Sequence, residues 1–224
     1  FLKIIIMKYL FFILIITISF VRAQDGNLNY GFAKSEKFIE GNLSFNTSKS
    51  EFLENNQKIE SKNSNINFTP KIGYLITDKL AFGIELSYGN SVNQNFNNIT
   101  NVIDENKNKS FGAGVFGRYY FLDLFKRFKV FSELGVNHYT NKNELNSNKV
   151  SDGNRFEADI DLGVNFFITE KIALTFLLND LIYFNSSRTN YDNGNKIKMN
   201  ELSGNLNSIN NIFNANSFGL LYKF

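Results

Sequence analysis

Charged residues stand at alternate positions in several segments of the chain that otherwise mix apolar and small polar residues. Five of them alternate in sign along the sequence: Glu40, Lys71, Glu85, Arg118 and Glu133. If these segments are neighbouring strands, the five side chains point to one side at similar depth. We then expect a ring of ion pairs, because an unpaired buried charge is costly. Such a ring either fills an interior or acts as a gate whose re-pairing opens a narrow conduit.

Three acidic residues, Glu157, Asp159 and Asp161, face one way along a single segment. Calcium takes about six to eight oxygen ligands in a compact cage. Alternate positions of one strand hold three carboxylates too far apart for all of them to bind one ion. We therefore predict no metal site.

Two other motifs have the residue types of enzymes but not their context. His138 is the only histidine and shares the side of its strand's apolar residues, whereas a lipid hydrolase or acyltransferase needs a histidine base beside a serine. The run Gly112-x-Gly114-x-x-Gly117 continues into Arg118 instead of opening a helix, as a dinucleotide site requires. We predict no enzymatic activity and no cofactor, with Gly112 and Gly114 making room in a narrow interior.

The elements that must position these residues are β-strands, since apolar and polar residues alternate with a period of two and no long helical period occurs after the N-terminal region. In the sixth segment Phe156, Ala158 and Ile160 alternate with the three acidic residues. Alternation is lost after Asn179, which predicts a bulge or an early end of the seventh strand. The eight predicted strands are 38–47, 64–76, 80–90, 109–121, 129–141, 155–168, 172–184 and 214–224.

Short and long connections alternate between these strands. Short turns are predicted at 77–79, 122–128 and 169–171, and long loops rich in Asn, Ser and Lys at 48–63, 91–108, 142–154 and 185–213. Aromatic residues recur at both strand ends: Tyr74, Tyr119, Phe121, Phe166, Tyr222 and Phe224 beside the short turns, and Phe45, Phe68, Tyr88, Phe111 and Phe156 near the long loops. Two aromatic girdles around an aliphatic zone are typical of a barrel in a bilayer, with its long loops outside the cell.

The N-terminal region predicts export. Residues 1–23, with an expected start at Met7, read as a basic residue, an apolar run to Phe20 and a cleavage site after Ala23, the pattern of a signal peptide. The run of about a dozen residues is short of the about 20 that a spanning helix needs. This segment holds three of the 24 basic residues, so the rest of the chain has 21 basic and 21 acidic residues, and no basic excess indicates nucleic-acid binding. We expect residues 24–37 to be a periplasmic segment and 38–224 to be the barrel domain.

A sheet that spans a membrane has to close on itself. Every backbone polar group in hydrocarbon must be paired within the protein, so spanning strands must form a closed sheet. We predict an all-β fold: an eight-stranded antiparallel up-and-down transmembrane β-barrel after a cleaved signal peptide, with both termini in the periplasm. Side chains just fill a barrel of about eight strands, which disfavours an open channel.

The last residues, Phe218, Leu220, Tyr222 and Phe224, resemble the C-terminal insertion signal of bacterial outer-membrane barrels. With the strand pattern and the alternating loops, residues 30–224 resemble the small outer-membrane β-barrel domain family, the group that includes OmpX and the transmembrane part of OmpA. The resemblance implies the outer membrane of a Gram-negative-type bacterium and contact with its lipids, including lipopolysaccharide. It also implies barrel-assembly machinery and periplasmic chaperones as partners.

Three functions follow in order of expectation. The first is a non-enzymatic role in envelope structure or in surface interaction, in which the long loops contact an unknown extracellular ligand. The alternative is a narrow porin-like channel for ions or small polar solutes. A lipid-modifying enzyme is the distant third, because the pattern predicts no inward His–Ser pair.

Overall fold

The computed structural model describes residues 30–54, 57–97, 102–204 and 217–224, so the predicted signal peptide lies outside the described residues. The described residues contain no helix long and apolar enough to cross a membrane. Their strands are β1 (Lys37–Glu54), β2 (Gln57–Leu75), β3 (Leu80–Asn97), β4 (Val102–Leu124), β5 (Phe128–Leu145), β6 (Asn148–Phe167), β7 (Ile172–Tyr191), β8 (Lys196–Gly204) and β9 (Ser217–Lys223).

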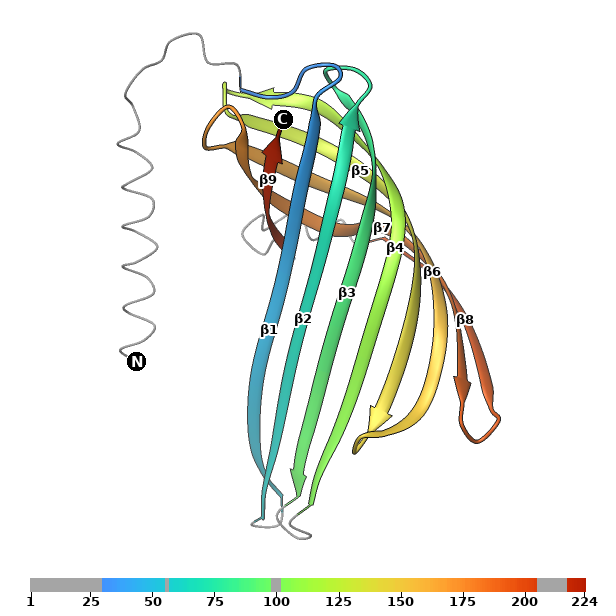
Figure 1. Ribbon diagram of the computed structural model, residues 1–224. Coiled ribbons are helices and arrows are strands. Elements are labelled where there is room, and N and C mark those ends of the chain that lie inside the picture. The colour runs from blue at the N-terminus through green and yellow to red at the C-terminus, as the bar shows by residue number, and fades with distance from the viewer. Residues whose placement is uncertain (1–29, 55–56, 98–101, 205–216) are drawn as a thin grey trace, which may run out of the picture.

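Eight of these strands close into a ring. Each pairs antiparallel with the next in the order β1 to β7 and then β9, and β9 returns to β1. Within the described part of the chain β8 pairs only with β7, and the two form a hairpin (Figure 1). The predicted all-β, eight-stranded antiparallel barrel is confirmed, with β8 as an addition that the sequence pattern did not predict.

One end of the barrel, which we call the turn end, carries the short connections 76–79, 125–127 and 168–171, as predicted. Two of these turns use the same device: the Thr77 hydroxyl accepts the Leu80 backbone N–H at 3.0 Å, and the Thr169 hydroxyl accepts that of Ile172 at 3.0 Å. Such a side-chain bond replaces a backbone partner where the chain reverses. Lys37 and Phe224 also meet at this end, where their backbones exchange hydrogen bonds.

The opposite end, which we call the extended end, corrects the sequence interpretation. The predicted loops 48–63, 91–108 and 142–154 are largely continued strand, and 185–213 contains the end of β7 and all of β8, so these loop predictions were wrong. Strand β4 alone is 23 residues long, although spanning takes only about 9–11. In water both faces of a strand can be polar, so the alternation in hydropathy disappears. The backbone pairing of β1 with β2 nevertheless continues there, together with ion pairs such as Lys49–Glu60 (2.9 Å).

The seventh strand contains the irregularity expected after Asn179. Leu162 of β6 lies opposite Leu178 of β7, but Ile160 lies opposite Ile182, so three residues of β7 face one residue of β6. This bulge confirms the prediction, and the strand then continues to Tyr191 instead of ending early.

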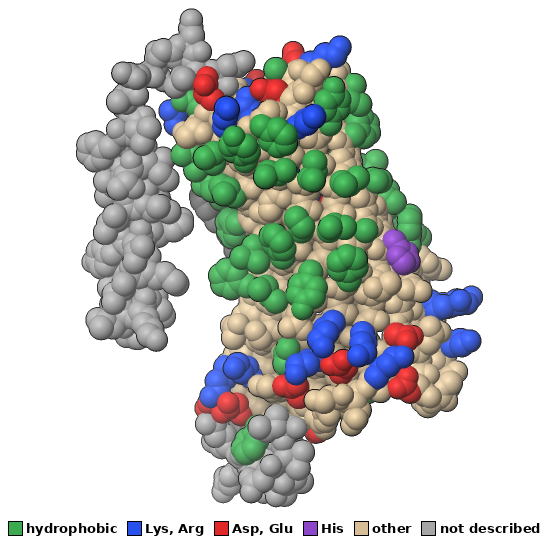
Figure 2. Space-filling model, viewed as in Figure 1, with side chains coloured by type: hydrophobic (Ala, Val, Ile, Leu, Met, Phe, Trp, Pro, Cys, Tyr) green, Lys and Arg blue, Asp and Glu red, His purple; other side chains and the backbone are tan. Residues whose placement is uncertain are grey.

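The outer surface carries an apolar band. Outward side chains at its centre, such as Ile84, Val115 and Leu134, are each more than half exposed. Figure 2 shows this band between two charged zones. Its edges carry exposed aromatic residues, among them Tyr74, Tyr119, Phe121, Tyr222 and Phe224 near the turn end and Phe45, Phe68, Tyr88, Phe111 and Phe156 on the other side. A continuous apolar belt of this kind suits lipid and not water.

Inward glycines determine how the interior fills. Seven of them lie directly opposite a longer inward side chain of the next strand, and that side chain lies across the glycine: Gly73 opposite Phe38, Gly83 opposite Phe116, Gly112 opposite Tyr139, Gly114 opposite Asn137, Gly135 opposite Asp159, Gly163 opposite Phe131 and Gly219 opposite Asn42. A Cβ on Gly83 would stand 2.1 Å from the Ile72 carbonyl oxygen and 2.5 Å from the Phe116 ring. The missing side chains therefore let long ones lie flat in a narrow lumen.

At the turn end the lumen is filled by an apolar layer, which we call the aromatic layer: Phe38, Phe116, Phe131 and Phe167, with Leu75 and Leu221 beside them. Residues before β1 complete it. The Phe32 ring lies 4.6 Å from that of Tyr120 and 5.3 Å from that of Phe167, and Tyr30 is buried in the same cluster. The last residues of the predicted periplasmic segment thus close the barrel end.

Candidate functional site

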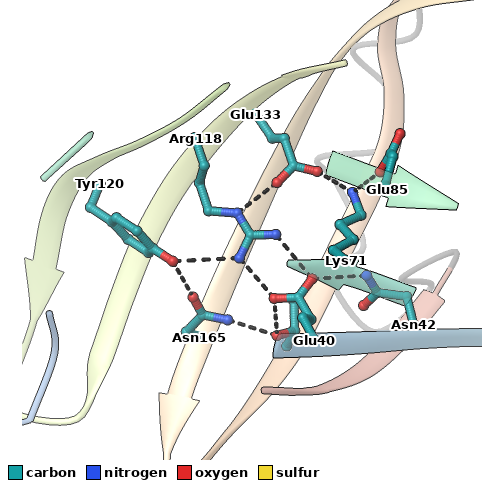
Figure 3. Close-up of polar contacts among 9 residues, drawn as sticks. Glu40, Asn42, Lys71, Glu85, Arg118, Tyr120, Glu133 and Asn165 are labelled. Carbon is teal, nitrogen blue, oxygen red and sulfur yellow. Dashed lines mark hydrogen bonds and ion pairs between the residues drawn. The ribbon is translucent and has the colours of Figure 1, made fainter. Parts of the chain in front are cut away.

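The structure brings the five charged residues singled out in the sequence together in the lumen, where each is at most 6% exposed (Figure 3). Register aligns two groups of them: Glu40 lies opposite Lys71 and Lys71 opposite Glu85, and Arg118 lies opposite Glu133. On the ladder between β3 and β4, Glu85 lies opposite Gly114, so the long side chains of Arg118 and Lys71 join the two groups. We call Glu40, Lys71, Glu85, Arg118 and Glu133 the lumen network.

Arg118 is its centre. From β4 its guanidinium reaches across to Glu40 on β1 with two bonds, Nη1 to Oε2 at 2.7 Å and Nη2 to Oε1 at 2.9 Å. Its Nε donates to Glu133 Oε2 at 2.6 Å. The rigid fork of arginine suits such paired carboxylates. The charge also lies 4.0 Å from the centroid of the Phe131 ring, whose face attracts a cation.

Lys71 makes a second link across the interior. Its Nζ lies 2.7 Å from Glu85 Oε2 on the next strand and also pairs with Glu133 on β5. Glu133 therefore bonds both cations. Two ion pairs at one depth cross the lumen, from β1 to β4 and from β2 to β5.

Neutral side chains that the sequence interpretation gave no role complete the bonding. Glu40 also accepts from Asn42 Nδ2 at 2.8 Å and from Thr175 Oγ1 at 3.0 Å. Tyr120 Oη donates to Asn165 Oδ1 at 3.0 Å, and Asn165 Nδ2 donates to Thr175 Oγ1 at 2.7 Å. Strand parity marks all four as inward, and that is the signal that finds them.

The two sides of the lumen network differ. Toward the turn end the aromatic layer covers it, whereas toward the extended end it forms the floor of a cavity of about 210 Å³. Lys71 and Glu85 belong to this floor, and the walls include Tyr139, Arg155 and Glu157. We call this space the polar cavity. The arrangement can hold charge and exclude water toward one end.

A comparison with known families decides what kind of protein this is. The model of the outer membrane protein beta-barrel domain matches residues 12–209. The chain belongs to this family. No curated protein matches the sequence.

A solved structure of an outer-membrane protein is similar to this chain in fold. The crystal structure of the outer membrane protein OprG from Pseudomonas aeruginosa superposes with a TM-score of 0.50 and 14% identity, covering 87% of this chain and 98% of that one. The NMR structure of the E. coli outer membrane protein W gives a TM-score of 0.45 and 13% identity, covering 86% and 99%. At this identity the likeness to OprG concerns fold alone.

In this member of the outer-membrane β-barrel family, the other residues that the sequence analysis considered for metal binding or catalysis do not belong to the lumen network. Glu157, Asp159 and Asp161 line the inward face of β6, the last at the edge of the lumen network's depth. Across the described ranges, no group of three or more His, Asp or Glu side chains is placed to hold a metal ion. His138 is exposed and lies opposite Phe156, outside the lumen.

The glycine motif and the C-terminal residues take the positions that strand parity gives them. Gly112 and Gly114 lie inside β4 and face inward, not at the start of a helix. The side chains of the C-terminal set lie on the outer face of the barrel, exposed to between 40% and 56%: Phe218, Leu220, Tyr222 and Phe224. Their role as an insertion signal stays a prediction.

Proposed function

We propose that this outer-membrane barrel is closed by its own side chains and serves envelope structure or surface interaction, without catalysis. The lumen network carries the proposal: Arg118 is fully buried and is bonded on both sides to carboxylates of other strands. Breaking such a buried pair would leave uncompensated charge, so the closed arrangement is favoured. The aromatic layer behind it adds a second barrier to ions.

The proposed orientation places the turn end and both termini in the periplasm and the extended end outside the cell. Short periplasmic turns and larger external parts are the rule for such barrels. The extended end would then meet an unknown extracellular ligand, and the apolar band would meet outer-membrane lipids and lipopolysaccharide. Barrel-assembly machinery and periplasmic chaperones remain partners that the family resemblance implies.

Conductance tests the closed state. The full chain, purified folded from outer membranes, is inserted into planar bilayers, and we expect no steady current. Arg118→Ala should produce openings of the lumen, because the Arg118 side chain lies between Glu40 and Glu133 and bonds to both. Lys109→Ala, which removes an exposed pair with Glu144 at the extended end, serves as the control and should stay closed. A steady current through the unaltered protein would contradict the proposal.

One observation favours a narrow channel as the second candidate. Glu133 bonds both Arg118 and Lys71, so a small movement exchanges its partners without leaving a charge unpaired. In that case the unaltered protein conducts, and Glu133→Gln changes the current. The same bilayer recordings therefore distinguish the two functions.

A further inference from the structure

The turn that joins β4 to β5 projects beyond the neighbouring strand. Strand β3 begins at Leu80, opposite Tyr119 of β4, but β4 continues to Leu124, and among the described strands its last residues pair with β5 alone. We call residues 121–128 the hairpin tip. It carries side chains past the edge of the barrel wall, so closure of the lumen does not require it.

A bulge at the base of the hairpin tip exposes two consecutive apolar side chains. Tyr120 lies opposite Phe131, but Leu122 lies opposite Val130, so Phe121 has no partner in this ladder. Such a bulge re-aims side chains that strict alternation would put on opposite faces. Phe121 and Leu122 are accordingly both exposed, to 44% and 45%.

Phe125, at the end of the hairpin tip, has an unusual backbone and an unusual environment. Its φ is +58°, a left-handed conformation that is costly for a bulky residue and that turns normally give to Gly or Asn. Its side chain is 88% exposed. A strained and exposed phenylalanine points to a contact with something outside the chain.

The apolar side chains of the hairpin tip adjoin the apolar band. Phe128 packs on Phe166 of β6 with the ring centroids 4.6 Å apart, and Leu124 lies opposite Phe128. Leu124 and Phe128 both remain exposed. Because this surface extends the band that faces lipid, lipid is the occupant that it fits.

The turn end as a whole is cationic. Its side chains include eight cations and four carboxylates, so four positive charges remain however these groups pair with one another. Lys126, directly beside Phe125, is exposed and makes no ion pair within the described residues. A cation next to an exposed ring suits the phosphates of lipid headgroups. The charged groups lie in the segments 30–37, 76–79, 121–129, 168–171 and 223–224.

We propose that the hairpin tip anchors the barrel in the headgroup layer of phospholipids at the turn end, with Phe125 and Leu124 among the acyl chains nearest the headgroups and Lys126 at a phosphate. The apolar contact offsets the strain at Phe125, and an anionic phospholipid is favoured over a zwitterionic one. This inference goes beyond the proposed function, because it concerns the outer surface and neither the closure of the lumen nor the orientation.

Fluorescence tests the lipid contact, because the chain contains no tryptophan. The full chain with Phe125→Trp is folded into vesicles of phosphatidylcholine and phosphatidylglycerol whose acyl chains are brominated near the headgroup. We expect bromine to quench this tryptophan about threefold more strongly than that of Leu145→Trp, at an exposed position at the other end of β5. Quenching no stronger than in this control would overturn the proposal.

The phosphate contact has its own variant. Lys126→Glu in the Phe125→Trp chain should lower the quenching about twofold, and so should vesicles of phosphatidylcholine alone. Lys196→Glu, at an exposed position of β8, is the control and should leave the quenching unchanged. Equal quenching for both variants and both lipid mixtures would refute the phosphate contact.

Stability separates an anchor from a merely strained turn. Phe125→Gly relieves the left-handed conformation, and so does Ser147→Gly in the turn between β5 and β6, where φ is +69° and no large apolar side chain is lost. If the Phe125 ring contributed nothing, both variants would raise the urea midpoint in vesicles. We expect Phe125→Gly to lower the midpoint and Ser147→Gly to raise it.

A higher midpoint for both variants would overturn the anchor. Each variant is first checked for the mobility shift of a folded barrel on an unheated gel. A failure here leaves the bilayer recordings unaffected, so the two proposals fail separately.

Discussion

The two halves of the barrel use different means to stay ordered. In the turn-end half, ion pairs and aromatic rings fill the interior and the apolar band faces lipid, so the order of this half rests on buried side-chain contacts. In the extended-end half the strands are polar on both faces, and pairs such as Lys109–Glu144 (3.3 Å) and Lys149–Asp152 (2.6 Å) lie at the surface. Exposed pairs contribute little, so backbone pairing supports this half. The same ladder is thus held by burial at one end and by its own hydrogen bonds at the other.

The largest expected effect breaks the interior of the turn-end half. Arg118→Ala leaves Glu40 buried without a cation and Glu133 with Lys71 alone, which should cost about 3–5 kcal/mol of unfolding free energy. Urea unfolding in lipid vesicles measures the loss. Lys109→Ala, which removes an exposed pair of the extended end, should change stability by no more than about 1 kcal/mol.

Restoring neutrality sharpens this test. A triple variant that adds Glu40→Gln and Glu133→Gln to Arg118→Met should recover much of the lost stability, because no charge then lacks a partner. If the triple variant were as unstable as Arg118→Ala, packing and not charge would govern this layer.

The second prediction compares glycines. Gly83→Ala forces a methyl group against the Ile72 carbonyl and the Phe116 ring, and we expect a loss of about 1–3 kcal/mol from overpacking. Gly204→Ala in β8 meets its nearest atom at 3.7 Å, an ordinary contact. Equal unfolding midpoints for the two variants would show that the interior is looser than its contacts indicate.

The third prediction concerns the residues before β1. Phe32→Ala removes a half-buried ring that packs on Phe38, Tyr120 and Phe167. We expect a loss of about 1–2 kcal/mol, below the about 3–5 kcal/mol of a fully buried ring. Leu202→Ala, at a side chain 76% exposed on β8, is the control and should be neutral. Thermal unfolding of both variants in one detergent makes the comparison.

The smallest effect is a response of the extended end to pH. Hydrogen bonds from Lys142 and Lys109 lower the pKa of Glu144 below its ordinary 4.5, and those from Lys149 and Asn190 lower the pKa of Asp152 below 3.8. A carboxyl with a lowered pKa stabilises the fold above its unfolded pKa, and this contribution is lost as the pH falls through the folded value. Amide exchange, corrected for its intrinsic pH dependence, should therefore speed up slightly at the extended end between about pH 6 and about pH 3, with the turn-end strands unchanged. Faster exchange at both ends would indicate general loosening.

Sequence alone predicts the turn-end half well because lipid and a narrow lumen impose a strict period of two. That period identified the inward positions of Glu40, Lys71 and Arg118 and the irregularity after Asn179. The extended ladders were missed because, in water, neither face of a strand has to be apolar, so Asn- and Ser-rich strands read as loops. Strand β8 is an example, with lysines and apolar residues that are exposed alike.

Strand parity marks the neutral partners of the lumen network as inward, but the bonds that they make across the lumen were beyond sequence reasoning. Thr175 reaches Glu40 because β7 and β1 both flank β9, a closure between segments 135 residues apart. The packing of Phe32 under the barrel likewise depends on where the chain enters, which strand periodicity does not encode. Register along the ladder was predictable, whereas distances across the lumen were not.

The length of the strands has a consequence for what a neighbouring surface meets. On β4, among the side chains that the structure describes, Phe111 is the last exposed apolar residue toward the extended end, and the strand continues beyond it through Val102–Ser110. At about 3.3 Å per residue and a tilt of about 40°, this extension rises about 23 Å. In the proposed orientation this height lifts the strand tips above the lipid headgroups into the zone of surface sugars. Contact with another cell or molecule would then be made by the ends of paired strands, whose height above the membrane is determined by strand length rather than by loop flexibility.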